Sequence, residues 1–155
     1  MRMKRVSVIG SGQCEPGSLE YVQALELGRL LAEAGFEIVC GGLFGVMEAV
    51  CKGARKADGR TVGIVPGCDA GQTNEWIETP IATGLGQMRN ALVVMNGDMA
   101  VAVGGGYGTL SEVALAKKSG KTVVAIGEMS EVDGVIRANS PQAVLEIVIK
   151  ELGRN

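Results

Sequence analysis

The chain has 155 residues and a net charge of −2, with 15 Lys and Arg residues against 17 Asp and Glu residues. This length predicts a single domain, residues 1–155, with enough chain to bury a substantial core. The charge balance provides no basic surface for nucleic acid or for a membrane, so we expect neither as a partner.

The absence of histidine restricts the chemistry that this chain can perform. None of the four cysteines forms a Cys-x-x-Cys pair, so we expect no zinc or other metal site. A nucleophile activated by His is excluded, and proton transfer falls to carboxylates, Lys, Tyr or Cys. Cys40 and Cys51 lie on apolar faces and are expected to be buried, whereas Cys14 and Cys68 fall in expected loops near the site.

No targeting or membrane segment is apparent in the sequence. Its apolar runs are much shorter than a membrane span, and the N-terminus leads into a short strand rather than a signal peptide. We therefore expect a cytoplasmic protein.

The first 65 residues alternate short β-branched runs with amphipathic runs. The expected strands and helices, in chain order, are strand 5–10, helix 18–34, strand 36–40, helix 46–56 and strand 60–65. Ser18 is a suitable N-cap for the first helix, and Gly35 ends that helix. A βαβαβ order requires a parallel sheet with right-handed crossovers.

The rest of the chain repeats this alternation after an interruption. Residues 68–86 are rich in turn-forming residues, and we interpret most of them as a loop over the carboxyl end of the sheet, with room for a short strand. The later expected elements are helix 88–95, strand 99–103, helix 109–118, strand 121–126, a polar loop at 127–140 with one weak apolar turn, and a helix that begins at 140–141 and runs to 152. The predicted fold class is α/β, a doubly wound, Rossmann-like parallel sheet in one nucleotide-binding domain.

Three glycine-rich turns are expected at the carboxyl ends of the strands, where open parallel sheets bind ligands. They are Gly10-Ser11-Gly12, Gly41-Gly42 with Gly45, and Gly104-Gly105-Gly106-Tyr107-Gly108. Tight strand-to-helix turns need glycine in any case, so the first two are weak signals. The third is stronger, because Thr109 and Glu112 follow it at the start of a helix, whose free N–H groups and dipole suit a phosphate.

Glu112 has two possible roles at this stage. It can be the return partner of a capping box begun by Thr109, or it can be a carboxylate directed at the ligand of the glycine turn.

Two other kinds of nucleotide-binding site are disfavoured by the sequence. It has no P-loop motif, and Glu15 stands where a dinucleotide fingerprint needs its third glycine.

Residues 105–112, Gly-Gly-Tyr-Gly-Thr-Leu-Ser-Glu, resemble the Pro-Gly-Gly-x-Gly-Thr-x-x-Glu signature of LOG-type, lysine decarboxylase-like nucleotide phosphoribohydrolases. Met88-Arg89-Asn90 supplies the upstream Arg of that family, and residues 41–47 look like its Gly-Gly turn and Gly-x-Met helix start. The resemblance covers roughly residues 6–125. Gly104 stands where the family has Pro, and Asn90 stands where it commonly has Lys. With these two differences, the sequence looks more like a bacterial and archaeal branch of the family, to which molybdenum-cofactor carrier proteins are also similar.

This resemblance implies a site for a small phosphorylated ligand. In one function, the protein cleaves the N-glycosidic bond of a nucleoside 5′-monophosphate, with Arg89 and Glu112 as catalytic residues. In the other, it binds or carries a nucleotide or the molybdenum cofactor without turnover, and neither function requires a resident cofactor. The expected ligand contacts are Gly10, Ser11, Gly12, Gly41, Gly42, Gly45, Met47, Arg89, Asn90, Gly104, Gly105, Gly106, Tyr107, Gly108 and Thr109.

A homodimer or a larger homo-oligomer is also expected. The helix that contains residues 91–95 is more apolar than one face of a sheet should need, and the family that the chain resembles forms such assemblies.

Overall fold

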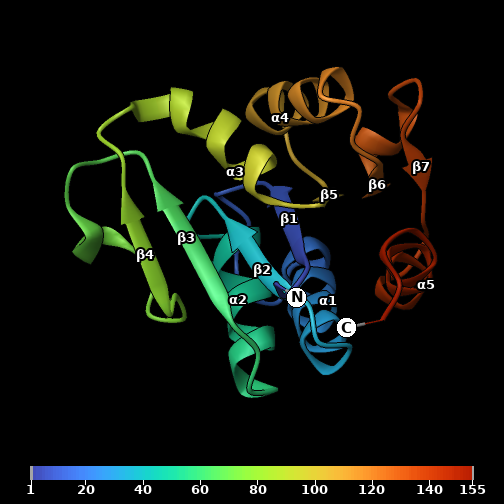
Figure 1. Cartoon of the computed structure of the whole chain (residues 1–155), viewed down its shortest axis with the longest axis horizontal. Helices are drawn as coiled ribbons and strands as arrows, with labels where there is room; N and C mark the ends of the chain where they lie inside the picture. The colour runs from blue at the N-terminus through green and yellow to red at the C-terminus, as the bar shows by residue number, and fades with distance from the viewer. Residues whose placement is uncertain (1, 155) are drawn as a thin grey trace.

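Seven parallel strands form one sheet in the computed structural model, which describes residues 2–154 (Figure 1). The strands are β1 (Arg5–Gly10), β2 (Glu37–Cys40), β3 (Thr61–Val65), β4 (Thr79–Ala82), β5 (Met99–Val103), β6 (Val123–Ile126) and β7 (Ile136–Arg137). The helices are α1 (Leu19–Glu33), α2 (Val46–Lys56), α3 (Asn90–Asn96), α4 (Tyr107–Lys118) and α5 (Pro141–Leu152). None of them is long and apolar enough to cross a membrane.

The strand order is β4-β3-β2-β1-β5-β6-β7, which confirms the predicted doubly wound topology. The chain moves outward from β1 to β4, returns to place β5 beside β1, and then continues to the opposite edge. The order therefore reverses between β1 and β5, whose pairing runs from Val6 opposite Met99 to Gly10 opposite Val103. The carboxyl ends of these two strands form the position where an open α/β sheet binds its ligand.

Helices cover both faces of the sheet, with α1, α2 and α5 on one side and α3 and α4 on the other (Figure 1). Side chains alternate between the two layers, so Val6 and Val8 of β1 face the first layer and Ile9 faces the second. The sheet face beneath the second layer combines Val and Ile side chains with three alanines, Ala100, Ala102 and Ala125.

Two glycines let α1 and α2 pack directly against each other. A Cβ atom at Gly28 would lie 1.9 Å from the carbonyl oxygen of Val50, and one at Gly53 would lie 1.9 Å from the carbonyl oxygen of Leu25. Each helix thus presents a backbone groove to the other, and neither position can carry a side chain without separating the helices.

Helix starts follow the capping signals of the sequence. The hydroxyl of Ser18 accepts a hydrogen bond from Tyr21 N at 3.4 Å, and that of Ser140 accepts one from Ala143 N at 3.1 Å. Helices α1, α2 and α5 begin and end within a residue of their predicted bounds, and at the starts of α1 and α5 the capping serine agrees with the apolar stripe.

The segment 68–86 is less loop-like than the sequence indicated. It contains a short 3₁₀ turn at Ala70–Gln72 and then β4, which pairs in parallel with β3 at the edge of the sheet. All four β4 residues are exposed, so no apolar pattern marks the strand, and Pro80 is tolerated because an edge strand has unpaired positions. The expected loop at 127–140 likewise contains a 3₁₀ turn and the two-residue strand β7.

Two helix starts near the expected site also differ from the prediction. A 3₁₀ turn at Gly86–Arg89 precedes α3, which begins at Asn90, and α4 begins at Tyr107 rather than at Thr109. Gly106 is the N-cap of α4 and forms no side-chain cap, so sequence rules based on capping side chains place the start too late.

We predict that Gly53→Ala lowers the free energy of unfolding by about 3 kcal/mol, because the added methyl group overpacks the contact between α1 and α2. Urea denaturation measures the change. Gly108→Ala is the control, since a Cβ there would meet nothing within 4 Å and the residue lies in helix α4. Equal stabilities for the two variants would contradict this account of the helix contact.

Candidate functional site

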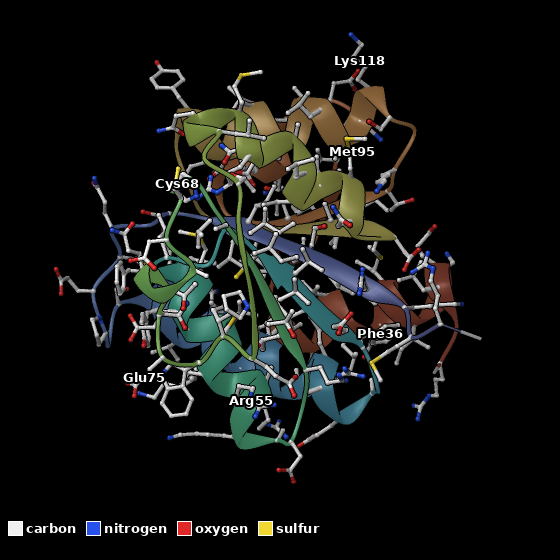
Figure 2. The ribbon with its side chains drawn as sticks, turned by 60° about the vertical axis from the view of Figure 1, so that its left-hand side comes forward. Phe36, Arg55, Cys68, Glu75, Met95 and Lys118 are labelled. Atoms are coloured by element: carbon white, nitrogen blue, oxygen red, sulfur yellow. The ribbon has the colours of Figure 1, made fainter. Side chains whose placement is uncertain are left out.

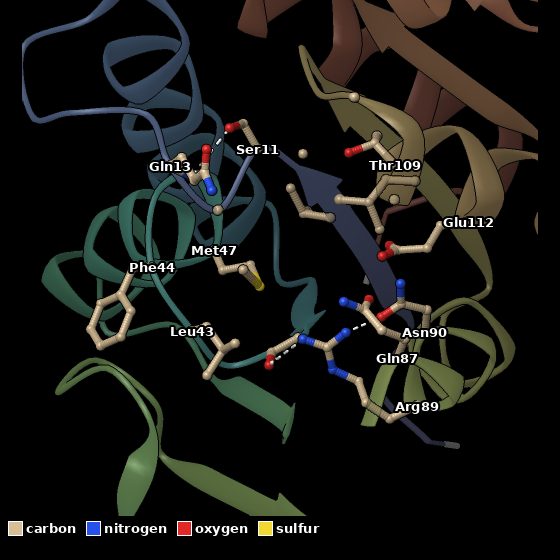
Figure 3. Close-up of a pocket in the computed structure, with 17 residues that line it drawn as sticks. Ser11, Gln13, Leu43, Phe44, Met47, Gln87, Arg89, Asn90, Thr109 and Glu112 are labelled. Atoms are coloured by element: carbon tan, nitrogen blue, oxygen red, sulfur yellow. Dashed lines mark hydrogen bonds between the residues drawn. The ribbon is translucent and has the colours of Figure 1, made fainter. Parts of the chain in front are cut away.

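A cavity of about 550 Å³ opens at the switch point between β1 and β5 (Figure 3). Its volume lies within the range of small-molecule sites. The lining residues come from β1 and the turn after it, the turn after β2, α2, the start of α3 and α4: Val8, Ile9, Gly10, Ser11, Gly12, Gln13, Gly41, Leu43, Phe44, Met47, Gln87, Arg89, Asn90, Gly106, Gly108, Thr109 and Glu112.

One wall of this cavity is the N-terminus of α4. The first intrahelical bond runs from Leu110 N to Gly106 O at 2.9 Å, so the N–H groups of residues 107–109 precede it. A Cβ atom at Gly106 or at Gly108 would meet nothing within 4 Å, which leaves the backbone open to a ligand. Figure 3 shows the Thr109 hydroxyl directed toward the side of the cavity where Ser11 lies. An anion at this end meets free N–H donors and the positive end of the helix dipole.

Arg89 forms part of the floor and is only 7% exposed. Its Nε donates to the carbonyl oxygen of Ile64 at 2.9 Å, one terminal nitrogen donates to Gly41 O at 3.3 Å, and the other donates to Asn90 Oδ1. Three of its five N–H groups are therefore used within the protein, and two remain. Burial lowers the pKa of Arg89, an effect that the charge of Glu112 opposes.

The glycine at position 41 is required by this arginine. A Cβ atom there would lie 2.7 Å from a terminal nitrogen of Arg89 and 2.8 Å from the sulfur of Met47. The Gly-Gly turn after β2 thus provides space for the guanidinium group.

The capping-box interpretation of Glu112 is wrong. Helix α4 begins at Tyr107, so Thr109 is its third residue rather than its cap, and no hydrogen bond to the Glu112 carboxylate is found within residues 2–154. Figure 3 shows this carboxylate directed into the cavity, on the side of Asn90 and Gln87. Burial raises the pKa of Glu112 to about 7, against the opposing charge of Arg89.

Five of the expected contact residues do not line the cavity: Gly42, Gly45, Gly104, Gly105 and Tyr107. The four glycines have positive φ angles and shape the turns. A Cβ atom at Gly45, for example, would lie 2.3 Å from the carbonyl oxygen of Ser11. A Cβ atom at Gly105 would lie 2.2 Å from Thr109 Oγ1. Tyr107 is 91% exposed at the start of α4.

Several lining residues were not expected from the sequence, namely Val8, Ile9, Gln13, Leu43, Phe44 and Gln87. Gln13 directly follows the first glycine turn and Phe44 lies inside the second, so the turns themselves were the available signal. Gln87 precedes Arg89 by two residues in a 3₁₀ turn that the sequence did not reveal. Trp76, a conceivable stacking residue, instead packs beside Lys52, whose ammonium lies 5.8 Å from the ring centre.

Comparison with known proteins identifies the class to which this fold and site belong. Residues 3–150 match the family described as LDcluster4, SLOG cluster4, and the chain belongs to this family. A protein of Archaeoglobus fulgidus is 37% identical over 149 residues, which cover 96% of this chain and 97% of that protein. This result confirms the predicted LOG-related superfamily.

More specific relatives are of two kinds. The molybdenum cofactor binding protein of Rippkaea orientalis is 35% identical with a TM-score of 0.91, covering 98% of this chain and 99% of that one. The molybdenum cofactor carrier protein of Chlamydomonas reinhardtii is 34% identical with a TM-score of 0.89, covering 99% and 100%. A probable cytokinin riboside 5′-monophosphate phosphoribohydrolase of Oryza sativa subsp. japonica is 34% identical over 116 residues, 72% of this chain but 47% of the rice protein.

The buried carboxyl of Glu112 predicts a pH-dependent stability difference. A carboxyl whose pKa rises on folding, here from 4.5 to about 7, costs stability as the pH rises through that interval and costs nothing below it. We therefore expect Glu112→Gln to raise the free energy of unfolding by up to about 3 kcal/mol at pH 8 and to have little effect at pH 4. Urea denaturation across this range measures it.

The control for this experiment is Glu75→Gln, which changes an exposed carboxylate between β3 and β4 (Figure 2). A stability gain for Glu112→Gln of the same size at pH 4 and pH 8 would show that the titration of Glu112 is not its cause.

Proposed function

We propose that the cavity binds a phosphorylated nucleoside or a similar heterocyclic ligand, with its phosphate at the N-terminus of α4. The support is the open backbone at Gly106 and Gly108, next to the Thr109 hydroxyl. The heterocycle would extend toward Leu43 and Phe44, on the opposite wall of the cavity in Figure 3. Side-chain amides of Gln13 and Gln87 would then supply donors and acceptors for its polar edge.

We further propose that the protein hydrolyses the N-glycosidic bond of a nucleoside 5′-monophosphate, and the observation that carries this proposal is Glu112. It is a carboxylate directed into the cavity, without a structural hydrogen bond and with a pKa near neutrality. In the ionised form it would stabilise the positive charge that develops at C1′ and accept a proton from the attacking water. The bond between C1′ and the base breaks, and the products are the free base and ribose 5-phosphate.

Arg89 would act mainly as a positioning residue in this reaction. Its bonds to Ile64, Gly41 and Asn90 fix the floor beneath Glu112, and its charge favours the ionised carboxylate. The two remaining N–H groups are available for ligand oxygens.

The alternative is a carrier that binds a nucleotide or the molybdenum cofactor without turnover. The nearly full-length similarity to two molybdenum-cofactor proteins favours it. The cavity fits a phosphorylated pterin as well as a nucleotide, since the anion site and the amide side chains serve both. Residues 2–154 contain no cluster of three or more His, Cys, Asp or Glu side chains that would hold a metal ion, so any metal would depend on the cofactor for its ligands.

Incubation with AMP and the other nucleoside monophosphates, followed by chromatography, separates the two functions. We expect free base from the parent protein and a loss of at least about 100-fold for Glu112→Ala, because general acid–base and electrostatic roles of this kind contribute that much. Thr109→Val is the companion variant, which should weaken nucleotide binding while leaving Glu112 in place. Tight binding of nucleotide or molybdenum cofactor with no release of base would establish the carrier and refute the hydrolase.

We also propose that the protein forms a homo-oligomer through the outer side of α3 and α4. Met88 is 74% exposed and Met95 63%, and Figure 2 labels Met95 of α3 and Lys118 of α4. A second cavity of about 550 Å³ between the two helices is predominantly apolar, with Ala91, Ala114 and Leu115 in its lining. Contiguous exposed apolar surface of this kind indicates a protein interface, and a two-fold contact would pair it with itself.

Sedimentation velocity tests this assembly. Leu115→Glu places a charge inside the apolar groove and should shift the protein to a smaller species. Leu19→Glu changes a more exposed leucine at the start of α1, 72% exposed against 37% for Leu115, and should not. A monomeric parent protein, or identical sedimentation of both variants, would refute the proposed interface.

A cytoplasmic location is the remaining part of this proposal. All four cysteines are free, which suits a reducing compartment.

A further inference from the structure

Two buried thiols lie in contact beneath the site. Cys40 is the last residue of β2, and Cys51 is on α2 in the layer that covers that face of the sheet. Their sulfur atoms are 3.5 Å apart, and neither side chain is exposed. A disulfide bond needs about 2.05 Å between the sulfurs, so a modest approach of the two side chains would complete one.

The thiol of Cys40 is also bonded to the turn that borders the cavity. The N–H group of Gly42 donates to Cys40 Sγ at 3.3 Å. The same turn is hydrogen-bonded to two other segments. Gly41 O accepts from Arg89 at 3.3 Å, and Gly42 O accepts from Asn74 N at 3.0 Å. A movement of Cys40 Sγ toward Cys51 therefore removes a bond that holds this turn.

The two thiols are not equivalent in their electrostatics. The hydrogen bond with Cys51 and the nearby charge of Arg89 lower the pKa of Cys40, whereas the pKa of Cys51 is raised. A lower thiol pKa favours the thiolate, so Cys40 is the better nucleophile of the pair.

We propose that Cys40 and Cys51 form a reversible disulfide, and that its formation displaces the Gly41–Gly42 turn at the floor of the cavity. This inference rests on the packing of β2 and α2 and is independent of which ligand the cavity binds. The oxidant is a small peroxide, admitted by local opening of the turn, since both thiols are buried in the closed structure.

The chemistry balances with hydrogen peroxide as the co-reactant. The Cys40 thiolate attacks one peroxide oxygen, the O–O bond breaks, and a sulfenic acid forms with release of water. Cys51 then attacks the Cys40 sulfur, a second water leaves, and the S–S bond forms. Two thiols have lost two electrons and two protons, and one peroxide has become two waters. A dithiol reductant reverses the change by thiol–disulfide exchange.

Trp76 provides an internal reporter of the displaced turn. It is the only tryptophan in the chain, and its backbone N–H donates to Asn74 Oδ1 at 2.9 Å. Asn74 in turn is bonded through its own N–H and side-chain amide to Gly42 O and through the same amide to Leu43 O. Loss of the bond from Gly42 to Cys40 should therefore change the surroundings of Trp76 and its fluorescence.

The test uses a Cys14→Ser, Cys68→Ser protein, which removes the half-buried and the exposed thiol and retains the buried pair (Figure 2). After treatment with hydrogen peroxide, we expect the mass to fall by two hydrogens, peptide mapping to join Cys40 to Cys51, and Trp76 fluorescence to shift. Reduction with a phosphine should restore the mass, the unlinked peptides and the fluorescence.

The matched control adds Cys51→Ala to the same background. This variant should show neither the two-hydrogen loss nor the reversible fluorescence shift, although Cys40 can then oxidise further to sulfinic acid and gain mass. A parent protein that keeps both thiols under peroxide, or that forms the disulfide with no change at Trp76, would overturn the proposal. Neither readout needs a ligand, so failure here is distinguishable from failure of the proposed hydrolase.

Discussion

The pairing of β1 with β5 is the contact on which the site depends. It brings together two turns that are about ninety residues apart in the chain, and it requires a close approach at their ends, where a Cβ at Gly10 would lie 2.4 Å from Val103 O. The same pairing sets the position of α4, because that helix begins a few residues after β5 ends. The N-terminus of α4 and the first glycine turn face each other as a result of strand order rather than of any direct bond between them.

Arg89 provides the second constraint, because it joins three elements that the sheet alone would leave independent. Its guanidinium spans from Ile64 in β3 to Gly41 after β2 and to Asn90 at the start of α3. Burying that charge is costly unless its donors are satisfied, and two backbone carbonyls and the Asn90 side chain satisfy three of the five. Arg89 therefore ties these three elements together at the floor of the cavity, and Glu112 is the carboxylate directed into the space above it.

The sequence was informative where local signals and burial coincide. The three glycine turns, the caps Ser18 and Ser140 and the buried strands were all readable from it, because each has a residue type that its geometry demands. The sequence left room for a short strand within residues 68–86 but did not place β4, because nothing in the pattern of its exposed residues reports an edge position. The start of α4 at Tyr107 was missed because a glycine N-cap has no side-chain signature, and this error was the sole basis for a capping role of Glu112.

The two helical layers differ in role: one is closely packed, and the other carries part of the candidate site and the exposed apolar face. The side with α1, α2 and α5 is closely interlocked, down to the backbone contacts of Gly28 and Gly53, and holds the larger aliphatic side chains. The side with α3 and α4 includes the alanines of β5 and β6 in its core and presents Glu112, Asn90 and the exposed apolar face. Variation in ligand choice or in assembly can therefore accumulate on one side of the sheet while the other preserves foldability, which would let a single scaffold diverge into both enzymes and carriers.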